Sequence, residues 1–227
     1  NSSQAQIDLG INWDRMTGWQ HTGTGDYSSW SGWNFKRASK CLDIVIFTFT
    51  GATTTFHHNL TVAPELIITK EYGRTYDWYT YGSALGTNKF IILNSNAAAT
   101  SYTFPSAVTA TTFQAGLASS NQATIAYLFA TLPGVSKVGS VVHSGTTDVD
   151  CGFSAGARFV LAKRTDSSGD WYVYDSARGI VAGNDPYLFL NSTAVQVNNT
   201  DYIDPLSSGF TLTSSFTAGT YIFLAIA

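Results

Sequence analysis

Charged side chains are scarce in this chain, and their scarcity limits what it can bind. Only 12% of the 227 residues are charged, and the formal net charge is −3 with a pI near 5.7. A nucleic-acid partner is not expected, because such a surface needs clustered Lys and Arg. No apolar run reaches the ~18 residues that a spanning helix needs, so no membrane span is expected. The chain starts at Asn1 without Met or an apolar signal core, which suggests a processed chain or a piece of a longer one.

Residue types that build catalytic and metal sites are also few. Glycoside hydrolysis needs two opposed carboxylates, but the two glutamates, Glu65 and Glu71, both follow one turn. No Gly-x-Ser-x-Gly sequence is present to supply an activated serine. His57 and His58 are adjacent, and neighbouring side chains of a strand point to opposite faces, which is poor geometry for one metal ion. We therefore expect no enzyme activity, no metal site and no cofactor.

The chain is instead rich in aromatic, β-branched and small polar residues. Hydrophobic residues make up 44% and aromatic residues 14%, with polar, uncharged turns between them. This composition is typical of an all-β protein. Short apolar runs separated by turn residues predict strands, at 43–51, 53–58, 65–70, 78–81, 89–94, 124–130, 158–163, 171–174, 187–191 and 221–227. Three alanines at 96–100 suggest a single helical turn.

An internal repeat is the strongest feature of the sequence. Lys70 and Asp77-Trp78-Tyr79-Thr80-Tyr81 return as Lys163 and Asp170-Trp171-Tyr172-Val173-Tyr174, at an offset of 93 residues. Leu93-Asn94-Ser95 returns as Leu190-Asn191-Ser192, at an offset of 97. A duplicated unit of ~90 residues is a domain-sized module rather than a solenoid repeat.

The repeat and the strand pattern together predict the architecture. We expect an all-β chain of two tandem antiparallel β-sandwich units related by internal duplication, unit 1 over 41–132 and unit 2 over 133–227. Residues 1–40 form an N-terminal segment rich in Trp, Gly and Ser that fits neither unit. The apolar strand at 221–227 is expected at a sheet edge, where it would suit docking onto a neighbour.

Two cysteines are too few for a disulfide framework. Cys151 stands where the first unit has His58, so the repeat does not require a thiol there. We expect Cys41 and Cys151 to be free and buried.

Aromatic side chains are the feature most suited to binding a ligand. Exposed Trp and Tyr rings can stack on sugars, which gives a set of candidate ligand-binding residues: Trp13, Trp19, Trp30, Trp78, Tyr81, Trp171 and Tyr174. For Trp78 and Trp171 a core position is the preferred interpretation, because a Trp that recurs in both repeats is more often required by the fold. Asp175 and Arg178 are expected to form a local ion pair at a turn.

Several landmark sequences occur in an order that is found in a known family: Lys36-Arg37-Ala38, Asp43-Ile44-Val45, Val160-Leu161-Ala162-Lys163, Trp171 with Tyr174-Asp175 and Arg178, Asn191, Leu206-Ser207-Ser208-Gly209-Phe210 and Gly219-Thr220-Tyr221. In this order residues 33–227 resemble a repeat module of virion structural and tail-fibre-like proteins of tailed bacteriophages, especially marine and cyanobacterial ones. The first unit departs from the pattern, since Gly82 follows Tyr81 and no Arg stands where Arg178 does.

The resemblance implies a non-enzymatic component of the phage virion, part of a tail fibre or tail tip. It implies an extracellular particle assembled in the host cytoplasm, with other virion proteins as partners. A homo-oligomer is expected, and fibres are commonly trimeric, although no threefold seam is visible in the sequence. A host cell-surface glycan is the candidate ligand. Two alternatives are a carbohydrate-binding module and a capsid coat or decoration protein.

Overall fold

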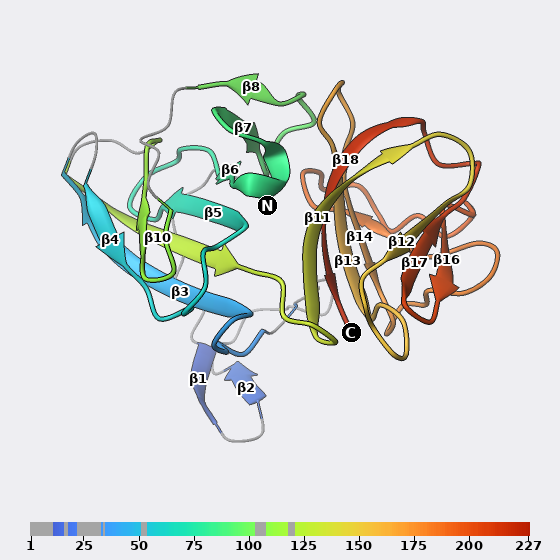
Figure 1. Ribbon diagram of the computed structural model, residues 1–227, viewed down its shortest axis with the longest axis horizontal. Helices are drawn as coiled ribbons and strands as arrows, with labels where there is room; N and C mark the ends of the chain where they lie inside the picture. Colours follow the sequence, from blue (N-terminus) through green and yellow to red (C-terminus); the bar gives the residue numbers. More distant parts are fainter. Residues whose placement is uncertain are drawn as a thin grey trace.

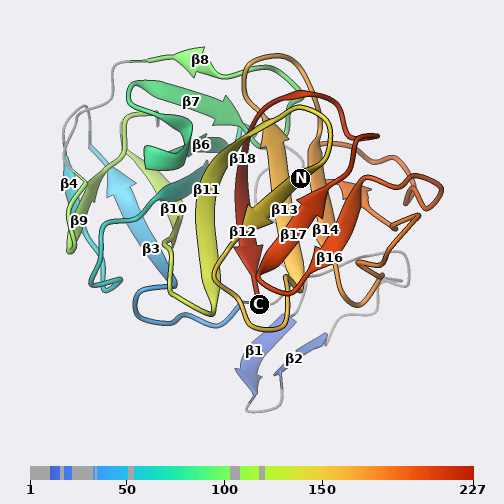
Figure 2. The same cartoon turned by 45° about the vertical axis from the view of Figure 1, so that its right-hand side comes forward.

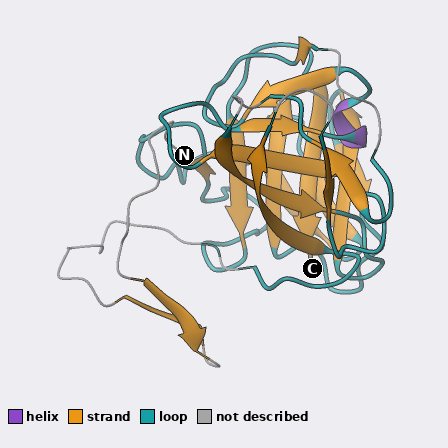
Figure 3. Ribbon diagram, turned by 90° about the vertical axis from the view of Figure 1, so that its left-hand side faces the viewer, coloured by secondary structure: helices purple, strands orange, loops and turns teal. Residues whose placement is uncertain are grey.

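The protein is described here from a computed structural model, which describes residues 11–15, 18–21, 33, 35–50, 54–102, 108–117 and 121–227. It is an all-β protein, as predicted from the sequence. The described residues contain one helical element, the 3-10 turn η1 (Ser83–Leu85), and are otherwise strands and loops (Figure 3). The strands are β1 (Ile11–Arg15), β2 (Gly18–His21), β3 (Leu42–Phe49), β4 (Thr55–His57), β5 (Leu66–Glu71), β6 (Tyr79–Tyr81), β7 (Lys89–Ile92), β8 (Thr100–Ser101), β9 (Thr112–Gln114), β10 (Gln122–Phe129), β11 (Ser136–His143), β12 (Thr147–Asp150), β13 (Phe159–Arg164), β14 (Trp171–Asp175), β15 (Leu188–Phe189), β16 (Ile203–Leu206), β17 (Gly209–Leu212) and β18 (Gly219–Ile226).

The strands form two large and three small antiparallel sheets. The first half contributes a six-stranded sheet, β3-β10-β5-β6-β7-β8, and the second a five-stranded sheet, β11-β18-β13-β14-β15. Two small sheets, β4-β9 and β12-β17-β16, accompany them, and β1 pairs with β2. No described strand of 41–132 pairs with a strand of 133–227. Figure 1 shows the two halves side by side, the first on the left and the second on the right.

The two halves have matching strand orders. In each large sheet the first strand of the half lies at one edge and pairs with the last strand, which in turn pairs with the strand that carries the repeated lysine. The register matches as well, because Ile67 pairs with Tyr81 as Val160 pairs with Tyr174. The repeated sequence motifs therefore occupy equivalent places in two similar sandwiches.

Both faces of the two large sheets are buried along their central strands, which produces four layers of strands. On β14, Trp171 and Val173 point to the core between the large sheets, whereas Tyr174 points to the core under β12-β17-β16. On β5, Leu66 and Ile68 belong to the same central core, and the intervening Ile67 belongs to the core under β4-β9. Alternate residues of a strand face opposite sides, so strands packed on both faces read as continuous apolar runs.

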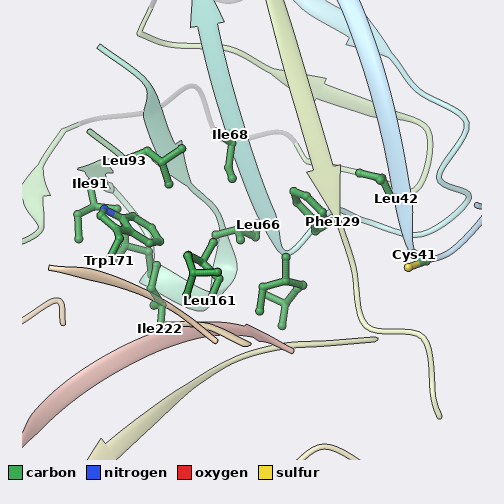
Figure 4. Close-up of a cluster of buried hydrophobic side chains, with 14 residues drawn as sticks. Cys41, Leu42, Leu66, Ile68, Ile91, Leu93, Phe129, Leu161, Trp171 and Ile222 are labelled. Atoms are coloured by element: carbon green, nitrogen blue, oxygen red, sulfur yellow. The ribbon is translucent and has the colours of Figure 1, made fainter. Parts of the chain in front are cut away.

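The central core joins the two halves into one hydrophobic unit. Figure 4 shows Leu66, Ile68 and Ile91 of the first half in one cluster with Leu161, Trp171 and Ile222 of the second. The cluster contains 14 buried residues drawn from both halves. Each large sheet thus contains strands of one sequence unit only, whereas the central hydrophobic core contains residues of both units.

Two local predictions were wrong. Residues 221–227 were expected at a sheet edge, but β18 lies between β11 and β13 and pairs with both along its length. Its apolar side chains face the two cores rather than a neighbouring molecule. The helical turn expected at 96–100 is also absent, because that loop is held in an irregular conformation by hydrogen bonds from the second half, including Gly169 N to Asn96 O at 2.9 Å.

Candidate functional site

The repeated Asp-Trp and Asn residues build the same structural link in each half. Asn94 Oδ1 accepts a hydrogen bond from Trp78 N at 2.9 Å, and Asn94 Nδ2 donates to Asp77 Oδ1 at 2.8 Å. In the second half Asn191 makes the equivalent bonds to Trp171 N and Asp170 Oδ1, both at 2.7 Å. An asparagine is suited to this position because its amide is both donor and acceptor. The motif therefore connects two neighbouring strand ends and does not line a pocket.

The repeated lysines are buried and bind backbone carbonyls. Lys163 has no exposed surface, and its Nζ donates to Ala97 O at 2.9 Å, Arg164 O at 2.8 Å and Asn96 O at 3.4 Å. Burial lowers the pKa of Lys163 to about 8, although the negative charge of Asp170 opposes the shift. Because Asn96 and Ala97 belong to the first half, Lys163 connects the two halves.

Lys70 has a similar but local role. Its Nζ donates to Glu71 O at 2.7 Å and to Arg74 O at 2.6 Å, both in its own half. Burial lowers the pKa of Lys70 as well, while Glu71 opposes the shift. The two lysines therefore hold backbone segments together through their carbonyl groups.

Three of the candidate ligand-binding aromatic residues lie in the core. Trp171 is 1% exposed and its indole Nε1 donates to Ile92 O at 3.0 Å, across the two halves. Tyr81 and Tyr174 are also buried, at 5% and 1% exposure. A ring without an exposed face cannot stack on a sugar, so the ligand-binding interpretation is wrong for these three residues. The preferred interpretation of Trp171 as a core residue is confirmed.

Trp78 is half-buried, and Trp13, Trp19 and Trp30 remain predictions. The Trp78 ring stacks on Tyr127 with the centroids 6.3 Å apart and packs against the central core. Trp13 and Trp19 lie on β1 and β2, but their side chains are outside the described residues, and so is Trp30 altogether.

The landmark pair Asp175 and Arg178 forms the expected ion pair, and Trp33 completes a cluster with it. Trp33 Nε1 donates to Asp175 Oδ2 at 2.9 Å, and the Arg178 guanidinium lies 5.4 Å from the centre of the Trp33 ring. Burial alone would raise the pKa of Asp175, but the hydrogen bonds from Trp33 and Arg178 outweigh it and hold that pKa below its usual value. The cluster fixes the segment before β3 against the second half.

The part of the chain that the structure describes contains no disulfide and no group of side chains placed to bind a metal ion. Cys41 and Cys151 are both free and buried, as predicted. Burial raises the pKa of the Cys151 thiol to about 12, which disfavours the reactive thiolate. No group of three or more His, Cys, Asp or Glu side chains among the described residues is placed to hold a metal ion. None of its helical segments is long and apolar enough to cross a membrane.

An open pocket of about 350 Å³ lies at one end of the second sandwich. Its walls come from the residues before β13 (Ala157, Arg158), the segment after β14 (Ser176, Ile180) and the turn between β16 and β17. That turn lies beside the C-terminal end of β18, as Figure 2 shows. Sequence reasoning missed this pocket, because its residues come from three segments that are far apart in the chain.

The polar groups in this pocket are side chains without internal partners. The ion pairs of the described residues do not include Arg158, which is exposed, and no hydrogen bond within the described chain engages its guanidinium. The hydroxyls of Ser176 and Ser207 are exposed and likewise have no partner there. Pro205, Leu206 and Ile180 supply an apolar wall. The pocket therefore offers one cation and two hydroxyls beside an aliphatic surface.

Comparison with known proteins identifies the family of the chain. The model of DUF7483, a domain of unknown function, matches residues 12–227, so the chain belongs to this family. No curated protein and no solved structure matched the chain.

Proposed function

We propose that the chain is a non-enzymatic structural module of a phage virion, part of a tail fibre or tail tip, and that it works as a homo-oligomer. The proposal rests first on the ordered resemblance of residues 33–227 to modules of such proteins. The observation that carries it is that landmark residues shared with these modules form structural contacts within this chain.

Four of these landmark residues, Lys163, Asn191, Asp175 and Arg178, have internal partners. Lys163 binds carbonyls of the loop at 96–97, and Asn191 joins Asp170 to Trp171. Asp175 binds Trp33 and Arg178. Residues that a family shares for catalysis would be expected to converge on a pocket with perturbed acids or bases. Landmarks that instead hold loops and strand ends together favour a load-carrying or spacing role.

The four-layered arrangement supports the same function. The central strands of each large sheet are buried on both faces, and the central core couples the halves. A particle appendage functions outside the cell as a rigid part, so a module with one continuous core between its units suits that use. Other virion proteins would be its partners.

Purified particles provide the test. The phage whose genome encodes the chain would be banded on a density gradient, and the particles analysed by quantitative mass spectrometry and by immunogold electron microscopy with an antibody against the chain. We expect the chain in fixed copy number in the particle and the label on the tail. A chain that is abundant in the lysate but absent from banded particles would overturn the proposal.

The location of the label separates the structural alternatives. Label on the capsid would replace the tail assignment with a coat or decoration role. Light scattering on the recombinant chain checks the oligomer, and a strictly monomeric chain at high concentration would contradict self-assembly through this segment.

A further inference from the structure

We infer that the pocket at the end of the second sandwich binds an acidic sugar, with Arg158 receiving the carboxylate. The inference goes beyond the proposed structural role and does not depend on it. It would give the second half, but not the first, a ligand-binding function.

The charge of Arg158 is the first support. Arg158 directly precedes β13 and lies two residues before Val160, so the two side chains share the face of the sheet that covers the outer core of the second half. The side chain therefore reaches the end of that sandwich, and no described side chain neutralises it there. A planar guanidinium with free N–H groups is well suited to a carboxylate, which it can bind through two parallel hydrogen bonds.

The other pocket groups favour a sugar as the carrier of that carboxylate. Ser176 and Ser207 offer hydroxyls that can both donate to and accept from sugar hydroxyls. Pro205, Leu206 and Ile180 form an aliphatic wall on which the C–H face of a pyranose can lie. The volume of about 350 Å³ is at the small end of ligand pockets, which suits one sugar residue rather than a long chain.

A peptide carboxyl terminus fits the pocket less well, because several of the surrounding backbone N–H groups are already used within the fold. Gly156 N donates to Ser207 O, Ala157 N donates to Gly209 O and Ser176 N donates to Arg158 O, at 2.7 to 2.9 Å. Capture of a peptide terminus commonly relies on such N–H groups. In this pocket the side chains of Arg158, Ser176 and Ser207 are available donors, and they suit a ligand with a carboxylate and several hydroxyls.

The first half does not repeat this chemistry. Glu65 is the counterpart of Arg158, because Glu65 N donates to Phe129 O at 2.8 Å as Arg158 N donates to Ile226 O at 2.7 Å. The Glu65 carboxylate accepts a hydrogen bond from Thr131 N at 2.5 Å. The same place therefore holds an internally bonded anion in one half and an unpaired cation in the other. Only the second half is expected to bind the ligand.

Binding is tested with two sugars that differ mainly in the carboxylate. The ¹⁵N-labelled chain is titrated with methyl β-glucuronide and, separately, with methyl β-glucoside, and amide chemical shifts are followed by NMR. We expect a Kd on the order of 1 mM for the glucuronide, the value anticipated for a small ligand in an open site. The shifts should be confined to residues 155–158, 176–180 and 205–207. Equal binding of the glucoside, or no binding of either sugar, would overturn the inference.

Variants and further ligands complete the test. Because Arg158 is exposed, Arg158→Gln should leave the NMR signals of the core residues unchanged. It should weaken glucuronide binding at least tenfold. Lys89→Gln, an exposed change in the first half, should leave binding unchanged. Binding that survives Arg158→Gln would overturn the inference. The inference would also be overturned if acetate, or a short peptide with a free carboxyl terminus, bound as tightly as the glucuronide. Because the isolated chain is used, a negative result here leaves the particle experiment unaffected.

Discussion

The buried Lys163 gives the fold a pH dependence whose sign can be worked out. Its ammonium has no exposed surface and connects the loop at 96–97 to β13 through carbonyl acceptors. Burial lowers its pKa to about 8 in the folded protein, from the 10.5 of an exposed lysine side chain. The unfolded chain therefore binds this proton more tightly than the folded chain does. Below pH 8 the buried charge lowers the free energy of unfolding, and this free energy increases as the pH rises from 8 toward 10.5.

The size of the effect follows from the shift in pKa. Each pKa unit corresponds to 1.36 kcal/mol, so roughly two and a half units correspond to about 3 kcal/mol over the full range. Buried tyrosines such as Tyr172, whose pKa burial raises, disfavour the fold at higher pH and limit the usable window to about pH 7.5–9.5. Within it, the contribution of Lys163 to the free energy of unfolding should increase by about 2 kcal/mol.

Lys163→Met isolates this contribution. The variant removes the ammonium but leaves carbonyls such as Ala97 O without their donor, at a cost of about 1–3 kcal/mol for each unsatisfied group. The loss of that donor and the removal of a buried charge oppose each other near pH 7, where the variant and the wild type should differ by about 1 kcal/mol or less. By pH 9.5 the wild type should be the more stable by about 2 kcal/mol.

Urea unfolding at several pH values, followed by tryptophan fluorescence, measures the difference. Lys89→Met is the control, because Lys89 is exposed and should give a profile parallel to that of the wild type. If the Lys163→Met profile is also parallel to that of the wild type from pH 7.5 to 9.5, the reasoning about the buried ammonium is refuted.

Three further predictions concern other parts of the fold. Asn94→Ala and Asn191→Ala should each lower the free energy of unfolding by about 2 kcal/mol, since each leaves an equivalent strand end unbonded, and urea unfolding should show similar losses for both. Burial raises the pKa of Asp185 to about 6, so its stabilising contribution is present at low pH and is lost as the pH rises through 6. Between pH 4 and 7, the free energy of unfolding of Asp185→Asn should therefore increase by up to about 3 kcal/mol relative to that of the wild type, as measured by guanidinium titrations. Fragments 41–132 and 133–227, expressed separately, should bind a hydrophobic dye and lack near-UV circular dichroism because the central core is exposed, and a well-dispersed NMR spectrum of either would contradict this.

The most apolar strands could be predicted from the sequence because their patterns are local, whereas β11, β12, β16 and β17 were not predicted. The strand expected at 65–70 is β5 at Leu66–Glu71, and the one at 171–174 is β14 at Trp171–Asp175. Similar motifs at offsets of 93 and 97 residues also placed equivalent residues in equivalent strands. These features depend on side-chain alternation and turn residues within one short window.

Packing between distant segments could not be predicted in this way. Strand 221–227 is as apolar as an exposed docking strand would be, but the same composition serves a central strand buried on both faces. Trp78 and Trp171 occupy matching positions in the repeat, yet Trp78 is half-buried and stacks on Tyr127, whereas Trp171 is fully buried and donates to Ile92 O of the other half. The Arg158 pocket depends on three separate segments meeting at one end of a sandwich. Each of these outcomes is decided by tertiary contacts.

The central core also sets a limit on how many such units can be joined. Each large sheet uses its outer face to cover a small sheet and its inner face to cover the other half. A third unit of the same kind, added to either end of the chain, would find no uncovered large sheet on which to lay its own inner face. Packing of large sheet against large sheet therefore joins two units and no more. In a longer array, such two-unit pairs would have to contact one another through their edges, ends or small outer sheets.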